Sequence, residues 1–233
     1  YNASKEDIIR ACEDVDGWII RSGTKIDKKM IKAAKKLKAI GRAGVGVDNI
    51  DIDEATKMGI IVMNTPDVNT ISAAEHTIAM MLALSRNVSI GDSEVKQMKW
   101  NRHLLIGSEL RGKTLGLVGV GKIGREVMSR CTSFGMHVLG YDPFVNKEMF
   151  KDGEIEIVDL DRLTEQSDFI SIHVPLNSET TNLFDYQRLK KMKQNARIIN
   201  VSRGGIINEK DLSRALIDGV IGGAAIDVFT KEP

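Results

Sequence analysis

The sequence predicts an α/β protein whose strands run parallel. Short apolar segments alternate along the 233 residues with longer segments in which apolar residues recur at helical spacing. Strands separated by helices pair in parallel, because each helix carries the chain back to the start of the next strand. A glycine-rich turn at residues 119–124 joins an apolar segment to a helical one, as in doubly wound parallel sheets. Together these observations favour two Rossmann-like domains, residues 1–70 and 71–233.

The composition is that of an ordinary folded protein and excludes several classes. Hydrophobic residues make up 42% of the chain, charged residues 28%, and the net charge is +1, which argues against disorder, a nucleic-acid partner or a membrane surface. The longest uninterrupted apolar run, residues 78–84, is too short to cross a bilayer. Cys12 and Cys131 form no disulfide or zinc pattern, and the first residues lack the order of a signal peptide. We therefore expect a cytoplasmic protein.

The predicted first domain begins with a helix that Ser4 would cap. A second helix is expected over residues 27–38, where the lysines fall on one face that we interpret as solvated. Three candidate strands follow the apolar segments at residues 18–20, 37–42 and 59–63.

The predicted second domain begins with a pair of connecting helices over residues 72–100, a stretch rich in helix formers and free of proline. Strands and helices then alternate more regularly than in the first domain. The five candidate strands are residues 114–118, 138–141, 169–173, 196–200 and 222–226. Helices are expected at residues 123–134, 160–166, 186–192 and 209–217.

The glycine turn, Gly119-Val120-Gly121-Lys122-Ile123-Gly124, is the sharpest local signal in the sequence. The first glycine permits a tight turn, the second lets a pyrophosphate approach the backbone, and the third lets the helix pack on the strand. The following helix would direct free N–H groups and a partial positive charge at the phosphates. A plain strand-turn-helix is the alternative, but the complete order of strand, loop, helix and second strand favours dinucleotide binding.

Asp142 ends that second strand, 18 residues after Gly124. Its carboxylate can accept hydrogen bonds from a ribose diol, and it would repel a 2′-phosphate. No arginine follows at residues 143–145 to bind such a phosphate, so the sequence favours NAD over NADP. The alternative for Asp142 is a surface Asp-Pro turn.

Ligands of open α/β sheets bind beyond the carboxyl ends of the strands, and three strand ends here carry unusual residues. Arg203 follows a strand and precedes two glycines, so its guanidinium could bind a carboxylate and polarise an adjacent carbonyl. Asp227 follows the last strand and could accept a hydrogen bond from a nicotinamide amide. His173-Val174-Pro175 ends another strand at a proline. For Arg203 a solvated salt bridge is the alternative.

Two turns of the first domain stay ambiguous from the residues alone. The turn at Gly44-Val45-Gly46 could present backbone N–H groups to a small anion, or it could be only a tight turn. The segment from Arg21 to Lys25 could bind a phosphate or face water. His76, His103 and His137 have no metal-ligand spacing, so we interpret them as structural or surface residues and expect no metal.

Several motifs follow one another along almost the whole chain. They are Arg42-Ala43-Gly44-Val45-Gly46-Val47-Asp48-Asn49, Asn64-Thr65-Pro66, the loop Gly119 to Gly124, His173-Val174-Pro175-Leu176, Ser202-Arg203-Gly204-Gly205 and Ala225-Ile226-Asp227-Val228-Phe229. In this order they resemble the D-isomer-specific 2-hydroxyacid dehydrogenases. The segments at residues 20–25, 41–44 and 227–233 are most similar to the members that oxidise D-3-phosphoglycerate, the step that opens the phosphorylated route to serine.

The resemblance implies an NAD-dependent oxidoreductase and gives roles to residues of both domains. Arg203 would bind the substrate's carboxylate and carbonyl oxygen, and Glu232 would orient a catalytic histidine. Gly44, Val45 and Gly46 would bind the substrate carboxylate through their backbone, with Arg21 and Ser22 near its phosphate. The NAD site would be formed by Gly119, Gly121, Lys122, Ile123, Gly124, Asp142, Val174, Pro175, Val201, Ser202 and Asp227. We expect a homodimer or higher homo-oligomer, and the helices at residues 72–100 would suit a two-fold dimer as in relatives.

In the family the catalytic histidine lies a short stretch beyond the Glu-Pro pair, and no histidine follows Glu232 in these 233 residues. The resemblance therefore implies a fold that is incomplete at both termini. We expect the 233 residues alone to bind NAD weakly and to turn over little or nothing.

Two other functions stay open. The chain could act on another pair of 2-hydroxy and 2-oxo acids. Glyoxylate, hydroxypyruvate and lactate are the alternatives. It could also be a non-catalytic NAD-sensing module, since the fold alone does not give the function. The presence of both Arg203 and Glu232 favours an enzyme.

Overall fold

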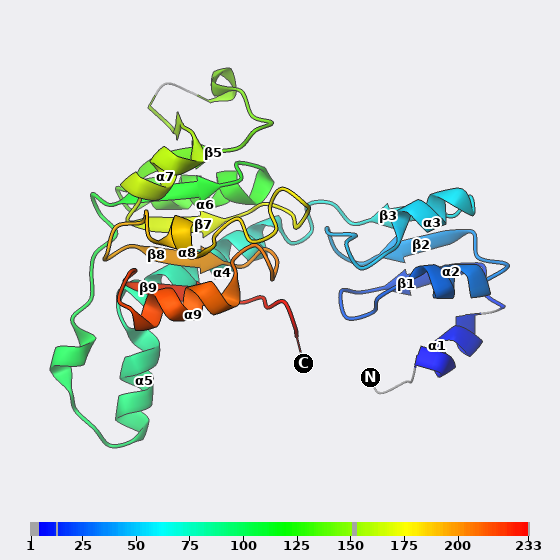
Figure 1. Ribbon diagram of the computed structural model, residues 1–233, viewed down its shortest axis with the longest axis horizontal. Helices are drawn as coiled ribbons and strands as arrows, with labels where there is room; N and C mark the ends of the chain where they lie inside the picture. Colours follow the sequence, from blue (N-terminus) through cyan, green and yellow to red (C-terminus); the bar gives the residue numbers. More distant parts are fainter. Residues whose placement is uncertain (1–4, 13, 151–152, 233) are drawn as a thin grey trace. The chain divides into compact units, whose positions relative to one another are not determined.

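The computed structural model describes residues 5–12, 14–150 and 153–232, and the chain divides into two compact units, Tyr1–Asn69 and Thr70–Pro233 (Figure 1). In both units every pairing between described strands is parallel, which confirms the predicted α/β class. The helix cap expected at Ser4 lies outside the described residues.

Within its described residues, the first unit contains a three-stranded sheet of order β1-β2-β3. Its strands are β1 (Gly17–Ile20), β2 (Ala39–Arg42) and β3 (Ile61–Asn64), and its helices are α1 (Lys5–Cys12), α2 (Lys28–Ala33) and α3 (Ile52–Lys57). Side chains alternate between the two faces of each strand. Trp18 and Ile20 of β1 pack with Met30 and Ile31 of α2, whereas Ile19 is 90% exposed on the other face.

The helix expected over residues 27–38 is shorter than predicted. Asp27 caps it by accepting from the N–H groups of Lys29 and Met30, and the helix ends at Ala33. The lysine face is not simply solvated, because Lys28 Nζ lies 3.0 Å and Lys32 Nζ 3.7 Å from the carboxylate of Glu54 on α3. The hydrogen bond from Lys28 lowers the pKa of Glu54.

The second unit is built on a sheet that has six strands among the described residues, in the order β6-β5-β4-β7-β8-β9. The strands are β4 (Thr114–Val118), β5 (His137–Tyr141), β6 (Glu156–Ile157), β7 (Phe169–Ile172), β8 (Arg197–Asn200) and β9 (Gly223–Ile226). The helices are α4 (Thr70–Ser85), α5 (Val88–Lys96), α6 (Lys122–Ser133), α7 (Leu160–Gln166), α8 (Tyr186–Leu189) and α9 (Glu209–Ile217), with short 3₁₀ turns at Arg102–Leu105 and Lys147–Met149.

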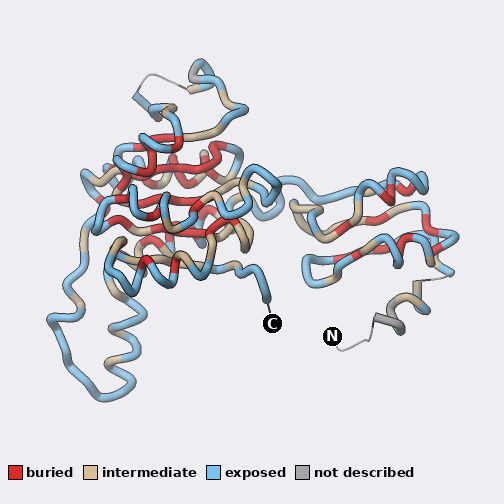
Figure 2. Tube along the Cα trace, viewed as in Figure 1, coloured by how far each residue is buried: buried red, intermediate tan, exposed pale blue. Residues whose placement is uncertain are grey.

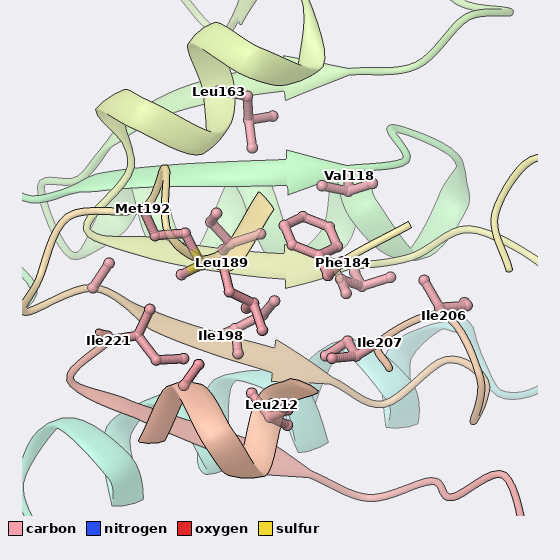
Figure 3. Close-up of a cluster of buried hydrophobic side chains, with 14 of the residues drawn as sticks. Val118, Leu163, Phe184, Leu189, Met192, Ile198, Ile206, Ile207, Leu212 and Ile221 are labelled. Carbon is pink, nitrogen blue, oxygen red and sulfur yellow. The ribbon is translucent and has the colours of Figure 1, made fainter. Parts of the chain in front are cut away.

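Helices cover both faces of this sheet, as a doubly wound fold requires. On one face Ile198 of β8 packs with Leu163 of α7, Leu189 of α8 and Leu212 of α9, in the cluster that Figure 3 shows. On the opposite face the neighbouring Ile199 belongs to the cluster that contains residues of α4 and α6. Figure 2 shows the buried residues concentrated along the strands.

The predicted boundaries are met for β4, α7 and α9, and several others differ by a residue or two. Besides the early end of α2, four differences are larger. The connecting helices expected to reach residue 100 end at Lys96, and α3 is absent from the prediction. The helix expected to reach Met192 ends at Leu189, and β6 is absent from the prediction because its two residues give no pattern of their own.

The strand order places a topological switch point at β4. The chain passes from β4 to β5 on one side and later returns to β7 on the other side of β4. Ligands of such sheets bind at this switch point. Across the described ranges, no helix combines the length and apolar character needed to span a membrane.

Candidate functional site

Gly119, directly after β4, adopts a backbone that only glycine takes without strain. Its φ is +96°, and its N–H donates to the carbonyl oxygen of Tyr141 at 2.8 Å. A Cβ on Gly119 would lie 2.7 Å from the carbonyl oxygen of His173. The loop therefore packs tightly on the ends of β5 and β7.

The other two glycines of the loop differ from each other in their surroundings. A Cβ on the buried Gly124 would overlap the carbonyl oxygen of Gly119, so this glycine lets α6 pack against the strand. Gly121 is exposed, has a φ of −72°, and a Cβ added to it would meet no atom within 4 Å. The open space at Gly121 lies where α6 begins, at Lys122, and leaves room for phosphates at the helix N-terminus. A cradle of this kind fits a dinucleotide.

Asp142 lies directly after β5 and its carboxylate borders the glycine loop. Oδ2 accepts from the N–H of Val120 at 2.9 Å, and Oδ1 accepts from the N–H of Phe144 at 3.0 Å. These two bonds hold the carboxylate beside the loop, where a ribose diol would need an acceptor.

His173 follows β7 and is unsuited to acid–base chemistry at neutral pH. Its ring Nε2 lies 2.8 Å from Oγ of the buried Ser171. The backbone N–H of His173 donates to the carbonyl oxygen of Val118. Desolvation lowers the pKa of His173 to about 4. The imidazole is therefore neutral near pH 7, and Val174 and Pro175 continue from it along the same strand end.

The turn after β8 is fixed by Asn200, a residue not singled out from the sequence. Its side chain is buried, at 2% exposure for the residue. Oδ1 accepts from the N–H of Ser202 at 3.0 Å and from its Oγ at 2.8 Å, while Nδ2 donates to the carbonyl oxygen of Arg203 at 2.9 Å. A polar residue ending an apolar strand was the available signal. These bonds hold the backbone of Val201, Ser202 and Arg203 in one shape.

Arg203 and Asp227 lie at neighbouring strand ends. The Nη1 of Arg203 donates to the carbonyl oxygen of Ser202 at 2.6 Å. The N–H of Asp227 donates to the carbonyl oxygen of Asn200 at 3.0 Å. A Cβ on Gly204 would lie 2.6 Å from the nitrogen of Thr230, so the turn after β8 packs on the backbone of the segment after β9.

Two further side chains occupy the segment after β9. The carboxylate of Asp227 lies against His76 of α4, with Oδ1 3.3 Å from Nε2. From the sequence, His76 was expected to be a structural or surface residue and was not placed here. The exposed Glu232 accepts through Oε1 from the N–H of Phe229 at 3.3 Å.

In the first unit, two turns lie at the carboxyl edge of the sheet. Register pairs Ile20 with Arg42, so Arg21 and Ser22 after β1 lie beside the glycine turn after β2. Gly44 has a φ of +145° and its N–H donates to Oγ1 of Thr65 at 2.7 Å. The carbonyl oxygen of Val45, next to Gly46, accepts from Nδ2 of Asn64 at 2.8 Å.

Asn49, the last residue of the motif that begins at Arg42, is bonded to the turn after β1, a contact that the sequence did not predict. Its Nδ2 donates to the carbonyl oxygens of Arg21 and Thr24 at 3.0 and 2.6 Å. Both turns therefore have defined backbones. Over the part of the chain that the structure describes, no three His, Cys, Asp or Glu side chains form a group able to hold a metal ion.

The family model described as "D-isomer specific 2-hydroxyacid dehydrogenase, NAD binding domain" matches residues 78–233. The chain belongs to this family. The resemblance read from the motifs is thus confirmed, and the part of the chain that carries the glycine loop, Asp142, Arg203 and Asp227 is the family's NAD-binding domain.

Curated relatives named D-3-phosphoglycerate dehydrogenase match over almost the whole chain. The protein from Synechocystis is 50% identical over 99% of this chain and 42% of its own length, and that from Archaeoglobus fulgidus 48% identical over 99% and 44%. The Homo sapiens protein is 45% identical over 100% and 44%. The chain thus spans less than half the length of these relatives.

Solved structures with about one third sequence identity have a similar fold. The TT0316 protein from Thermus thermophilus has a TM-score of 0.92 at 35% identity, covering 100% of this chain and 74% of that one. D-lactate dehydrogenase from Aquifex aeolicus, complexed with NAD and lactic acid, has a TM-score of 0.89 at 32% identity, covering 96% and 67%.

Proposed function

We propose that the protein oxidises D-3-phosphoglycerate to 3-phosphohydroxypyruvate with NAD, the first step of phosphorylated L-serine biosynthesis. The observation that carries this proposal is the 45–50% identity, over 99–100% of the chain, to relatives named for that activity. Solved dehydrogenases and reductases named for other substrates are 29–33% identical to this chain. In this proposal residues 1–70 belong to the substrate-binding domain, and residues 71–233 form the NAD-binding domain with its leading helices.

We propose that the glycine loop and α6 hold the pyrophosphate of NAD. Gly119, Gly121 and Gly124 shape the loop, with Lys122 and Ile123 in the first turn of the helix. The carboxylate of Asp142 accepts from the adenosine ribose, and its charge, with no cation at residues 143–145, disfavours a 2′-phosphate. Val174, Pro175, Val201 and Ser202 line the NAD site, and Asp227 accepts a hydrogen bond from the nicotinamide amide. When bound, the nicotinamide ring takes up or returns a hydride.

The residues of this chain would bind and polarise the substrate. The guanidinium of Arg203, on a turn fixed by Asn200, binds the carboxylate and the oxygen at C2, where negative charge develops as the hydride moves to the oxo acid. The backbone of Gly44, Val45 and Gly46 holds the carboxylate, and Arg21 and Ser22 bind the phosphate. Glu232 orients an acid–base histidine and raises its pKa, the role of this carboxylate in the family. His173 does not fill that role, because its pKa is about 4.

The substrate assignment is tested with Arg21→Ala in the full-length protein. NADH oxidation is measured with 3-phosphohydroxypyruvate, hydroxypyruvate and glyoxylate. We expect wild type to prefer the phosphorylated acid, and Arg21→Ala to lower kcat/KM for that acid by about 10²-fold and for the other two by less than about threefold, because a lost charge-assisted contact is worth about 1.5–3 kcal/mol.

The matched control is Arg111→Ala, which removes an exposed arginine before the amino end of β4. Equal losses on all three acids in Arg21→Ala would contradict the phosphate assignment. Tight NADH binding without turnover of any acid would favour the NAD-sensing module instead.

We further propose that the protein self-associates through α5 and the segment after it. No residue of α5 is buried within the described structure, and Figure 1 shows this helix projecting from the sheet of its unit. Its Val88, Ile90 and Val95 are exposed, and beyond it Met98 is 94% and Trp100 77% exposed. Apolar surface of this extent on one projecting element is typical of an interface between subunits.

For this surface we expect Trp100→Glu to shift the protein from dimer toward monomer, since an aromatic anchor at an interface contributes about 2 kcal/mol or more. Light scattering after size exclusion measures the mass. Phe144→Glu, which changes a similarly exposed aromatic residue after β5, is the control and should leave the mass unchanged. A wild type that is monomeric at micromolar concentration would refute the interface.

A further inference from the structure

The carboxylate of Asp227 has one side-chain partner in the described part of the chain, and that partner comes from a distant helix. His76 on α4 places Nε2 at 3.3 Å from Oδ1 of Asp227. The two side chains are about half-exposed, at 49% and 50%. A contact between two exposed side chains ordinarily contributes little to stability. Its place at the carboxyl end of β9, where ligands of such sheets bind, suggests another role.

The backbones of both His76 and Asp227 are held in place by the surrounding structure. Ala74, Ile78 and Met81, on the buried side of α4, belong to a core cluster against which Ala225 of β9 packs. The backbone of Asp227 is fixed by its N–H, which donates to the carbonyl oxygen of Asn200 at 3.0 Å. The helix that carries His76 therefore cannot move away from the strand end without opening the core.

A hydrogen bond from His76 would reduce the freedom of the Asp227 side chain before any ligand binds. In the tautomer that carries the proton on Nε2, His76 would donate to Oδ1 of Asp227, 3.3 Å away, and would leave lone pairs on Oδ2 for a second donor. Without this bond, the carboxylate on an exposed turn would sample several rotamers, and binding would have to order it. Preorganisation of this kind raises affinity only for a ligand that donates a hydrogen bond to that oxygen.

We infer that His76 is a positioning residue that holds the carboxylate of Asp227 in place to accept a hydrogen bond from the carboxamide of the nicotinamide ring. The inference rests on the proposed function, which places Asp227 at the nicotinamide end of the site. His76 itself touches Asp227 and takes no part in the hydride transfer.

The test compares two ligands that differ at the carboxamide alone. Reduced 3-acetylpyridine adenine dinucleotide carries a methyl ketone in place of the amide and cannot donate to Asp227. Dissociation constants for NADH and for this analogue are measured by fluorescence on full-length wild type, His76→Ala, His76→Gln and Asp227→Ala. We expect His76→Ala to weaken NADH about three- to tenfold and the analogue by less than about twofold.

Two variants separate positioning from a general structural effect. The side-chain amide of His76→Gln can donate in place of the ring and should restore most of the preference for NADH. In the Asp227→Ala background, His76→Ala should have no further effect on either ligand. His103→Ala, at an exposed histidine in the 3₁₀ turn after α5, is the control.

The tautomer of His76 can also be measured in the protein without ligand. Nitrogen-15 NMR should show the Nε2–H tautomer of His76 in wild type and a mixture of tautomers in Asp227→Ala. Equal weakening of both ligands in His76→Ala, or an effect that persists without Asp227, would overturn the inference. An unchanged preference for NADH over the analogue in Asp227→Ala would also overturn the inference, but it would leave the dehydrogenase assignment intact. A wild type that binds no NADH would overturn both the inference and the proposed function.

Discussion

Alanine at Gly121 is expected to abolish most dinucleotide binding while leaving the protein folded. The position is exposed, its φ of −72° suits any residue, and no atom lies within 4 Å of the added methyl group. The free energy of unfolding should therefore stay within about 1 kcal/mol of wild type. The methyl group would occupy the space through which a pyrophosphate approaches the N-terminus of α6, so the affinity for NADH should fall by at least about tenfold.

Gly124→Ala provides the contrasting result in the same loop. Here the methyl group would overlap the carbonyl oxygen of Gly119, so the helix or the loop must shift. We expect a loss of about 1–3 kcal/mol in the free energy of unfolding, or about 2–4 °C in Tm for each kcal/mol. Urea unfolding and NADH titration measure the two effects, and Ser129→Ala, an exposed change later on α6, is the control. Strong destabilisation by Gly121→Ala, or normal NADH affinity in that variant, would contradict this account of the loop.

Replacing Arg203 should remove most of the catalytic rate and little else. We expect Arg203→Gln to lower kcat/KM by about 10³-fold, because a preorganised cation at the developing oxyanion is lost. Arg203→Lys keeps the charge but not the planar pair of donors, and it should lose about 10²-fold. The affinity for NADH should change by less than about twofold in both variants.

Steady-state kinetics and NADH titration on the full-length protein measure these effects, with Arg111→Gln as the matched control. A loss that appears only in KM, with kcat unchanged, would show that Arg203 binds the substrate and the transition state equally well, which would contradict a specific role at the developing oxyanion. Equal losses in glutamine and lysine variants would assign the effect to the geometry of the guanidinium and not to its charge.

Local signals were sufficient for the elements whose boundaries the sequence predicted. The strand β4 is a continuous apolar segment, and α7 and α9 begin after Asp159 and Asn208, whose side chains cap them. The strand β6 has two residues and exists because it pairs with β5, which no local pattern reveals. The helix α2 ends early because Leu37 must turn into the core before β2 begins.

In the candidate site too, features that lie within one segment of the sequence could be predicted, whereas contacts between distant segments could not. The glycine loop could be recognised because three glycines and a terminal acid lie in one strand-loop-helix unit. The contact between His76 and Asp227 could not, because it joins an early helix to the last strand of the sheet. Asn200 lies next to residues that were recognised, yet its three hydrogen bonds depend on how the following turn folds back over the strand end.

Gly204 approaches the backbone of Phe229 and Thr230 closely. This contact couples the positions of the turn after β8 and the segment after β9. The turn that carries Arg203 and the segment that carries Asp227 share backbone contact there, and the amide of Asp227 is bonded to Asn200 beneath them. A displacement of one backbone segment would strain the other, so the two backbones that carry the cation and the carboxylate are held together. In any change of conformation, the turn after β8 and the segment after β9 would therefore shift as one.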